Sequence, residues 1–328
     1  MNVLVFEWLT GGGLLIEGLN PDAACPFQQQ GRAMLEALVD DFCSLTDVNC
    51  IVPVDHRQSP RLPALANAIA TSSSDLEEQL KQISNDADYV VLIAPECPVH
   101  FPDAGVQPCL LQLLRWLEAD CGKLISPDST FVEVASDKTR TMDLLRASGI
   151  PVPEGCRLDH VGTLWNPAME SGPIVLKPNF GAGSEGVQKI ATTRQPVFTV
   201  PSNNASDWRV EKFCEGIPVS CSAICDREEI HCLPPMYQQF NGTPFGTFEF
   251  SRPIDDPNLA MRIQTLAERA IRAMPETRGY VGVDLIAGDT SDEDVVIEIN
   301  PRLTTSYIDI RQCVPANVAA MMLPQVIA

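Results

Sequence analysis

The chain lacks an excess of basic residues. It has 23 lysines and arginines against 43 aspartates and glutamates, which gives a formal net charge of -20 at pH 7. A nucleic acid or an anionic membrane would need a basic patch to meet its phosphates, so this charge balance argues against both partners. An anionic small molecule remains compatible with the chain if a few local cations and a metal ion bind it.

The chain also lacks segments that would direct it to or through a membrane. No apolar run approaches the roughly 18 to 20 residues that a membrane-spanning helix needs. The opening MNVLVFEWLTGGG has no basic region and carries Glu7 within its apolar run, so it does not resemble a signal peptide. We therefore expect a cytoplasmic protein. Its 328 residues, 45% hydrophobic and 20% charged, suit two or three globular domains.

The twelve cysteines include no CxxC pair and no cysteine–histidine spacing typical of zinc sites. Several lie in apolar periodic runs, where a free cysteine behaves as a small buried hydrophobe. We expect reduced structural thiols. The histidines have no partner at a catalytic spacing, and we expect loop or surface positions for His56, His100, His160 and His231.

Strand and helix patterns alternate over the first third of the chain. Apolar runs indicate strands at 2–8, 49–54, 89–95 and 123–125, with a glycine turn at 11–13. Helical spacing of apolar residues indicates helices at 28–42, 75–83 and 106–119. This alternation predicts a parallel sheet with helices on both faces, whose ligands collect beyond the carboxyl ends of the strands. Glu7 and Glu96 follow two such strands.

The pattern changes after residue 126. A helical pair over 126–149 ends at a glycine and a proline-rich segment, followed by strand–turn–strand units at 174–190 and 208–226. A helix at 259–274 and two further strands complete the chain. We expect an α/β domain at 1–125 and two α+β lobes, one at 126–208 with the glycine loop and one at 209–328 with a metal site.

Three oxygen-bearing side chains follow from the strand patterns near the carboxyl terminus. The β-branched run 295–297 predicts a buried strand, and Glu298 and Asn300, two residues apart, share one of its faces. A second short strand can bring Asp284 alongside. Oxygen ligands without histidine or cysteine suit Mg²⁺ or Mn²⁺, and Arg302 offers a fork of donors to a phosphoryl group. The alternative is an edge strand with solvated acids.

The segment 181–186 matches the pattern GxGxxG. A dinucleotide fingerprint would open a helix, but residues 187–191 alternate like a strand. A strand, glycine loop and strand instead predict a flap whose amides close over phosphates, with Lys177 on the preceding strand reaching the same phosphates. Protein kinases place the lysine after the loop and need an HRD segment, which is missing. The alternative is a glycine hairpin without a ligand.

Together these motifs resemble, in order over about residues 126–311, the ATP-grasp superfamily of carboxylate–amine ligases. The resemblance implies a combined α/β and α+β fold in which two α+β lobes follow a parallel-sheet domain and sandwich ATP. It also implies Mg²⁺ or Mn²⁺ as the metal. Within the superfamily, EINPRLTTSYIDIR and VFEWLTGGG most resemble the tyramine–glutamate ligase group of methanofuran-type cofactor biosynthesis.

The resemblance also implies roles for individual residues. Lys138, in DKTRTMDLL, matches a lysine that binds phosphate and takes part in catalysis. Lys177 matches the lysine that contacts the α-phosphate and the adenine side. Arg302 matches the arginine that steadies an acyl phosphate, and the metal ligands match Asp284, Glu298 and Asn300. The other ATP-binding positions lie in the phosphate-covering loop (Gly181, Gly183, Ser184, Glu185, Gly186), at the adenine amino group (Glu211) and in the purine slot (Lys212, Phe213).

The implied reaction is ATP-dependent amide formation between a small-molecule carboxylate and a small-molecule amine. A carboxylate attacks the γ-phosphate to give an acyl phosphate, and an amine then displaces phosphate. Two alternatives stay open: an ATP-grasp kinase or carboxylase with another acceptor, and a non-catalytic nucleotide-binding sensor. The sequence leaves homo-oligomer formation open.

Candidate residues for binding the substrates other than ATP lie at the end of the first strand and in the C-terminal segment. Glu7 can receive an ammonium group, and the glycines around Gly12 let backbone approach a ligand closely. Arg311 could meet a substrate carboxylate, for which glutamate is the expected acid. The alternative is that Glu7 caps a neighbouring helix.

An aromatic-rich run covers residues 237–250, between the strand–turn–strand unit at 208–226 and the predicted helix at 259–274. It either lines a pocket for an aromatic amine or forms the core of a small hairpin, and its members are Tyr237, Phe240, Phe245, Phe248 and Phe250. We favour the hairpin.

Overall fold

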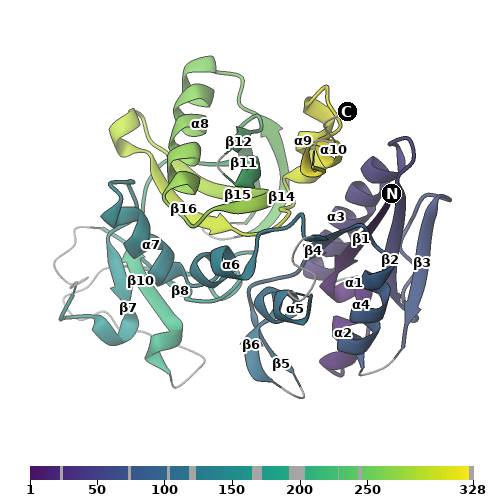
Figure 1. The fold of residues 1–328 in the computed structure, drawn as a ribbon. Coiled ribbons are helices and arrows are strands. Elements are labelled where there is room, and N and C mark those ends of the chain that lie inside the picture. The colour runs from purple at the N-terminus through teal and green to yellow at the C-terminus, as the bar shows by residue number, and fades with distance from the viewer. Residues whose placement is uncertain are drawn as a thin grey trace.

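Three main β-sheets organise the chain (Figure 1). The computed structural model describes residues 1–22, 25–72, 75–101, 104–117, 123–164, 172–191, 204–227, 229–242 and 246–324. One four-stranded sheet lies in the N-terminal part, a second four-stranded sheet follows it, and a six-stranded sheet forms the C-terminal part.

The N-terminal sheet is parallel, with strand order β3-β2-β1-β4. Val3 and Val5 share one core with Leu35 and other residues of α3, whereas Leu4 and Phe6 pack on the opposite side with α4 and α5. Because alternate strand residues point to opposite faces, helices cover both faces, as predicted. The elements are β1 (Asn2–Glu7), β2 (Asn49–Asp55), β3 (Ala66–Thr71), β4 (Tyr89–Ile93), α3 (Pro26–Cys43), α4 (Leu76–Asn85) and α5 (Cys109–Leu117).

Several local predictions in this part are wrong. The glycine turn is instead two single-turn helices, α1 (Trp8–Gly11) and α2 (Gly13–Ile16), joined at Gly12 with φ 126°. The predicted helix at 106–119 begins only at Cys109, because β6 (Gly105–Pro108) pairs with β5 (Pro98–Phe101), and residues 118 and 119 lie outside the described residues. Half-exposed β3 was not predicted, because its alanines and asparagine have low strand propensity, and the strand expected at 123–125 is reduced to one bridge at Leu124.

The second sheet is antiparallel, with strand order β7-β10-β8-β9. Its strands are β7 (Gly155–Arg157), β8 (Ile174–Pro178), β9 (Gln188–Ile190) and β10 (Trp208–Lys212). The glycine loop joins β8 to β9, so the predicted strand–loop–strand unit is confirmed. Since β10 pairs with β7 and β8, this sheet runs to Lys212, past the lobe boundary expected at residue 208.

The third sheet has strand order β14-β13-β11-β15-β16, and β12 pairs with β11. Its core includes residues of α6, α7 and α8, which contribute Phe131, Met142 and Ile263. The elements are β11 (Ile217–Arg227), β12 (Glu229–Cys232), β13 (Met236–Asn241), β14 (Thr247–Pro253), β15 (Thr277–Ala287), β16 (Val295–Asn300), α6 (Ser129–Ala135), α7 (Lys138–Ala147) and α8 (Pro257–Arg272), with 3₁₀ turns at Leu158–His160, Ala205–Asp207 and Ser291–Glu293.

The aromatic-rich run forms the β13–β14 hairpin, as the sequence predicts. The rings of Phe240 and Phe248 meet edge to face with centroids 6.1 Å apart. The hairpin is not a sealed core, because Phe250 is 45% exposed. Phe245 lies outside the described residues.

The last two helices connect the N-terminal unit to the third sheet. Helices α9 (Tyr307–Cys313) and α10 (Val318–Met322) lie between α3 and that sheet in Figure 1. Tyr307 and Ile310 share one core with Leu35 and Leu38 of α3 and with Tyr280 of β15. The N-terminal unit and the C-terminal lobe are therefore packed on a common apolar core.

None of the helices within the described residues is long and apolar enough to cross a bilayer. No two described cysteines form a disulfide, and Cys121 lies outside the described residues. Six of the described cysteines are buried, which fits their place in apolar runs: Cys43, Cys50, Cys109, Cys156, Cys221 and Cys225.

Candidate nucleotide and metal site

A pocket lies where the second and third sheets face each other. Its wall brings together most of the residues predicted to bind ATP, together with one predicted metal ligand. The predicted residues among its lining are Lys138, Lys177, Gly181, Ser184, Glu185, Glu211, Lys212, Phe213 and Glu298. Apolar lining comes from Val175 and Val187 on one side and from Ile286 and Ile297 on the other. Such a mixture of apolar walls and convergent charges is typical of small-molecule sites.

Lys138 contacts both the glycine loop and β16, the strand that carries Glu298. It begins α7, where Asp137 caps the helix, and the residue is 7% exposed. Its Nζ lies 2.6 Å from Glu298 Oε1 and donates to the Gly181 carbonyl oxygen at 2.7 Å. Burial alone would lower the pKa of Lys138, but the Glu298 carboxylate raises it, so the ammonium stays charged. A phosphate between the loop and β16 would meet this charge.

The second lysine belongs to a buried triad of charges. Lys177 Nζ lies 2.6 Å from Glu211 Oε1, and Arg209 Nε donates to Glu211 Oε2 at 2.9 Å. Burial would raise the pKa of Glu211, but the charges of Lys177 and Arg209 lower it. Two cations share one carboxylate, so the triad carries a net positive charge. That charge suits a nucleotide phosphate, whereas the predicted contact of Glu211 with adenine stays a prediction.

The predicted metal ligands lie side by side on β15 and β16. Asp284 is the cross-strand partner of Glu298, and Asn300 pairs with Gly282 two residues along the same strands. Asn300 Nδ2 donates to Asp284 Oδ2 at 2.8 Å. Burial, and then the charge of Glu298, raises the pKa of Asp284 to about 6. Two carboxylates held this close repel each other, and a divalent cation between them would offset the repulsion.

The donor set fits a magnesium ion that also binds phosphates. Within the described residues no group of three or more histidine, cysteine, aspartate or glutamate side chains is placed to hold a metal. The site therefore offers two carboxylates and the amide oxygen of Asn300. Mg²⁺ commonly binds through one or two carboxylates and completes its shell with waters and substrate phosphates. These three residues thus suit Mg²⁺ or Mn²⁺ that arrives with a nucleotide.

The glycine loop has a defined shape. Gly183, Ser184 and Gly186 have φ values of 64°, 63° and 72°. A positive φ is uncommon outside glycine, so the conformation at Ser184 indicates a constrained loop. A Cβ added at Gly183 would lie 2.5 Å from Phe27 Cε1 in α3. The loop is therefore docked against the N-terminal unit.

Arg302 is placed next to the metal residues and held by Glu96. The guanidinium Nε lies 3.0 Å from Glu96 Oε1, and Nη2 donates to Glu96 Oε2 at 3.1 Å. Both residues are largely buried, and Arg302 follows Asn300 by two residues. The predicted role of Arg302 at an acyl phosphate stays a prediction.

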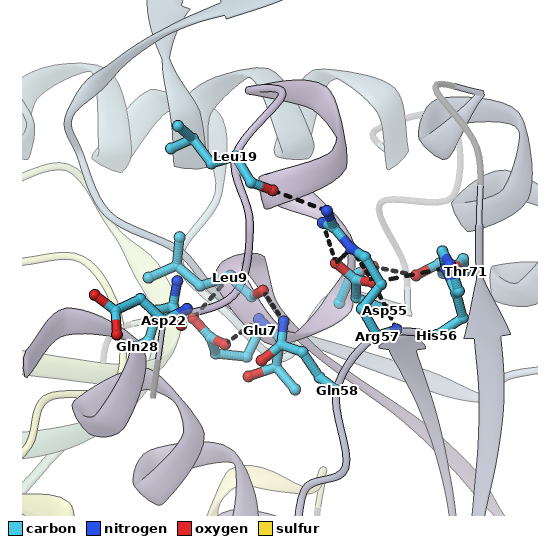
Figure 2. Close-up of polar contacts among 12 residues, drawn as sticks. Glu7, Leu9, Leu19, Asp22, Gln28, Asp55, His56, Arg57, Gln58 and Thr71 are labelled. Carbon is cyan, nitrogen blue, oxygen red and sulfur yellow. Dashed lines mark hydrogen bonds and ion pairs between the residues drawn. The ribbon is translucent and has the colours of Figure 1, made fainter. Parts of the chain in front are cut away.

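Glu7 lies at the carboxyl end of β1, as predicted, and caps the first helix. It is 3% exposed and accepts hydrogen bonds from the amides of Leu9 and Thr10 at 3.1 and 2.7 Å (Figure 2). Burial raises its pKa. This is the alternative that the sequence left open. Gly12, with its positive φ, faces Thr71 and Leu76, so its predicted contact with a substrate, like that of Glu7, stays a prediction.

Arg311 binds the N-terminal unit. Its Nε donates to Asp41 Oδ2 at 2.8 Å and its Nη2 to Asp40 Oδ2 at 2.7 Å, and both acids belong to α3. The Tyr307 hydroxyl donates to the same Asp41 carboxylate. Arg311 is not among the residues that line the pocket. These contacts give it a structural role, and its predicted role at a substrate carboxylate stays a prediction.

Two residues at the site were not predicted, and a third was predicted without its partner. Arg209 lies two residues before Glu211 on one strand, so a shared face could have revealed it. Gln238 Nε2 donates to Asp284 Oδ1 at 2.8 Å from the β13–β14 hairpin, a pairing that no local pattern announces. Glu96 was recognised at the end of a strand but without a partner.

Comparison with known proteins defines the class that this fold and site belong to. A model of the ATP-grasp domain matches residues 135–306, which is more than half of the 328 residues. The chain belongs to the ATP-grasp family. It has the ATP-grasp fold, and the expected combination of a parallel-sheet α/β unit with α+β lobes is confirmed.

The chain is similar to several particular proteins. It is 24% identical over 313 residues to tyramine–L-glutamate ligase from Methanocaldococcus fervens, covering 94% of this chain and 89% of that protein. It is 26% identical over 238 residues to D-alanine–D-alanine ligase from Azorhizobium caulinodans, covering 69% and 74%. Among solved structures, an ATP-grasp superfamily protein from Archaeoglobus fulgidus superposes with a TM-score of 0.71 at 20% identity, covering 98% and 87%. The D-alanine–D-alanine ligase of Bacillus anthracis complexed with ATP gives 0.61 at 14% identity, covering 98% and 94%.

Proposed function

We propose that the protein is an ATP-dependent ligase that joins a carboxylate to an amine through an acyl phosphate. The observation that carries the proposal is the pocket where Lys138, the Lys177 triad, the glycine loop and Glu298 converge. The similarity to ligases that act on amino acids supports the same reaction class.

The chemistry has two steps. An oxygen of the substrate carboxylate bonds to the γ-phosphorus of ATP as the bond to ADP breaks. The amine nitrogen then bonds to the carbonyl carbon, the bond to phosphate breaks, and the nitrogen loses a proton. Such phosphoryl and acyl transfers depend mainly on positioning and on neutralisation of charge.

The side chains of the pocket suit those two demands. Lys138 and the net positive triad around Lys177 would bind the phosphates, while the amides of the glycine loop cover them. Asp284, Glu298 and Asn300 would hold Mg²⁺, which when bound neutralises charge on the transferring phosphate. Arg302 would hold the acyl phosphate with the donors that Glu96 does not use.

Glutamate as the acid and tyramine as the amine are the first substrates to test. The similarity to a tyramine–L-glutamate ligase over most of both chains supports this pair. A place in cofactor biosynthesis of the methanofuran type belongs to the same proposal and rests on the sequence resemblance alone. We also propose that Glu7, Gly12 and Arg311 contact these substrates. The division into lobes at residues 125 and 208 belongs to the same proposal. The boundary at 208 falls at the start of β10, which pairs with β8 of the preceding lobe.

The test measures ADP formation for each amino acid paired with each of a set of amines, with mass spectrometry of the product. We expect ADP and an amide in equal amounts only when the acid, the amine, ATP and Mg²⁺ are all present. ADP with a phosphorylated acceptor would show a kinase, and dependence on bicarbonate a carboxylase. ATP binding without ADP formation under every pairing would contradict the ligase and favour the sensor.

A further inference from the structure

Glu96 links the N-terminal sheet to the C-terminal lobe. It follows β4 and is 3% exposed. Its partner Arg302 is 206 residues away, with Nε 3.2 Å and Nη2 3.1 Å from Glu96 Oε2. A carboxylate that takes two adjacent donors of a guanidinium fixes the plane of that group as well as its place. The N-terminal unit therefore sets the orientation of a side chain that β16 supplies.

The remaining donors of Arg302 are limited. Nη1 donates to the carbonyl oxygen of Leu303 at 3.2 Å, while Nε and Nη2 bind Glu96. A guanidinium has five N–H donors, so these contacts use three and leave two. Both remaining donors lie on the terminal nitrogens. Rotation of the side chain would redirect them, and Glu96 opposes that rotation.

The same segment also contacts the glycine loop. Cys97, the next residue, lies beside the backbone of Ala182 in that loop, which lowers the pKa of the thiol, although burial raises that pKa on balance. The adjacent Gly181 carbonyl is bound by Lys138, and Gly183 rests on Phe27. Two consecutive residues of the N-terminal unit thus contact Arg302 on one side and the loop on the other.

We propose that Glu96 is a positioning residue for amide formation, which orients Arg302 toward the acyl phosphate. The inference rests on the proposed function and deepens it. Glu96 does not line the nucleotide pocket, so it acts on the reaction through Arg302 and not through ATP binding. Misplacement of a reacting or stabilising group by about 1 Å can cost on the order of 100-fold in rate.

The principal variant is Glu96→Gln, which removes the charge with little change in volume. We expect kcat to fall by about 10- to 100-fold while the KM for ATP stays within about twofold. The matched control is Asp294→Asn, because Asp294 is also buried and pairs with an arginine, Arg262, at 2.7 Å, but away from the pocket. We expect this control to lower the melting temperature without lowering kcat.

A double-mutant cycle separates positioning from a merely structural effect. If Glu96 acts through Arg302, Glu96→Gln should cause little further loss of kcat in an Arg302→Ala background. Glu96→Asp retains the charge and should recover part of the rate. Hydroxylamine trapping should show less acyl hydroxamate in Glu96→Gln than in the unmodified protein.

Two results would overturn the proposal. One is a Glu96→Gln variant that matches Asp294→Asn, with a lower melting temperature and unchanged kcat. The other is a double variant, Glu96→Gln with Arg302→Ala, in which the fold loss of kcat equals the product of the two single losses. If Glu96→Gln does not fold, Glu96→Asp enters the same cycle. Failure of the proposed function looks different, because the unmodified protein would then form no amide with any pair of substrates.

Discussion

Two regions of this molecule collect charged side chains at the ends of strands, and they use them differently. In the pocket, Lys138, Lys177 and Glu298 pair across elements and leave positive charge beside open space. At the carboxyl edge of the N-terminal sheet, Glu7 and Arg57 bind mainly their own neighbourhood.

The segments that follow β1 and β2 at the N-terminal edge are held by contacts within the N-terminal unit, which Figure 2 shows. Arg57 forms a fork with buried Asp55, with Nη2 2.6 Å from Oδ2, and its Nη1 donates to the Leu19 carbonyl oxygen at 2.9 Å. Gln58 Nε2 donates to the carbonyl oxygen of Leu9 at 2.6 Å. These bonds hold the segment that follows β1 against the sheet. A position at a strand end is therefore insufficient evidence of a ligand site; the partners decide.

The largest expected effect tests the pocket as a catalytic site. Glu298→Gln keeps the volume but removes a metal ligand and the partner of Lys138. We expect kcat to fall by at least about 100-fold, the scale seen when one stabilising group at a transition state is lost. Circular dichroism and the melting curve should show an intact fold. Near-normal turnover at saturating Mg²⁺ would sink the metal assignment.

The next effect tests whether the docked glycine loop belongs to the pocket. Gly183→Ala should raise the KM for ATP and lower kcat together, each by several-fold, because φ is 64° and the new Cβ would meet Phe27 at 2.5 Å. Gly181→Ala is the matched comparison, since its Cβ would meet only Pro178 at an ordinary 3.6 Å, and its effect should be smaller. Equal kinetics for both variants and the unmodified protein would make the loop structural.

A smaller effect appears in the dependence on pH. With a pKa of about 6, Asp284 is mainly ionised at pH 7.5 and mainly protonated at pH 5. Metal binding must displace that proton, so the Mg²⁺ concentration for half-maximal ADP formation should rise as the pH falls below about 6. Asp284→Asn is the control, because asparagine does not titrate and the pH dependence that this variant retains comes from the titration of ATP. A dependence on pH identical in both proteins would show that Asp284 does not bind the metal.

The smallest effect concerns the N-terminal edge. Glu7→Ala removes the acceptor for two amides and should lower the free energy of unfolding by about 0.5–2 kcal/mol, with Glu7→Gln between it and the unmodified protein. If Glu7 also reads a substrate, as the sequence predicts, the KM for the amine should rise as well. A change in stability alone would assign Glu7 to the cap and sharpen the contrast between the two regions.

Much of the pocket could be predicted because its motifs are local. A β-branched run followed by Glu298 and Asn300 sets which face of a strand those side chains leave, and residues 174–190 set a loop between two strands. The resemblance of these motifs, in order along the chain, to those of a known superfamily then predicted the family. The cap at Glu7 remained an alternative because strand-end position and helix capping leave the same local pattern.

The sequence by itself predicted many of the elements, the faces from which their side chains project and the family to which the chain belongs. The tertiary structure decided the partners: Glu96 for Arg302, α3 for Arg311, and Arg209 beside Lys177 at Glu211. The physical reason is that spacing along a strand or helix fixes direction over a few residues. A charge then pairs with whichever opposite charge the packing of distant elements brings within reach, and no local pattern contains that choice.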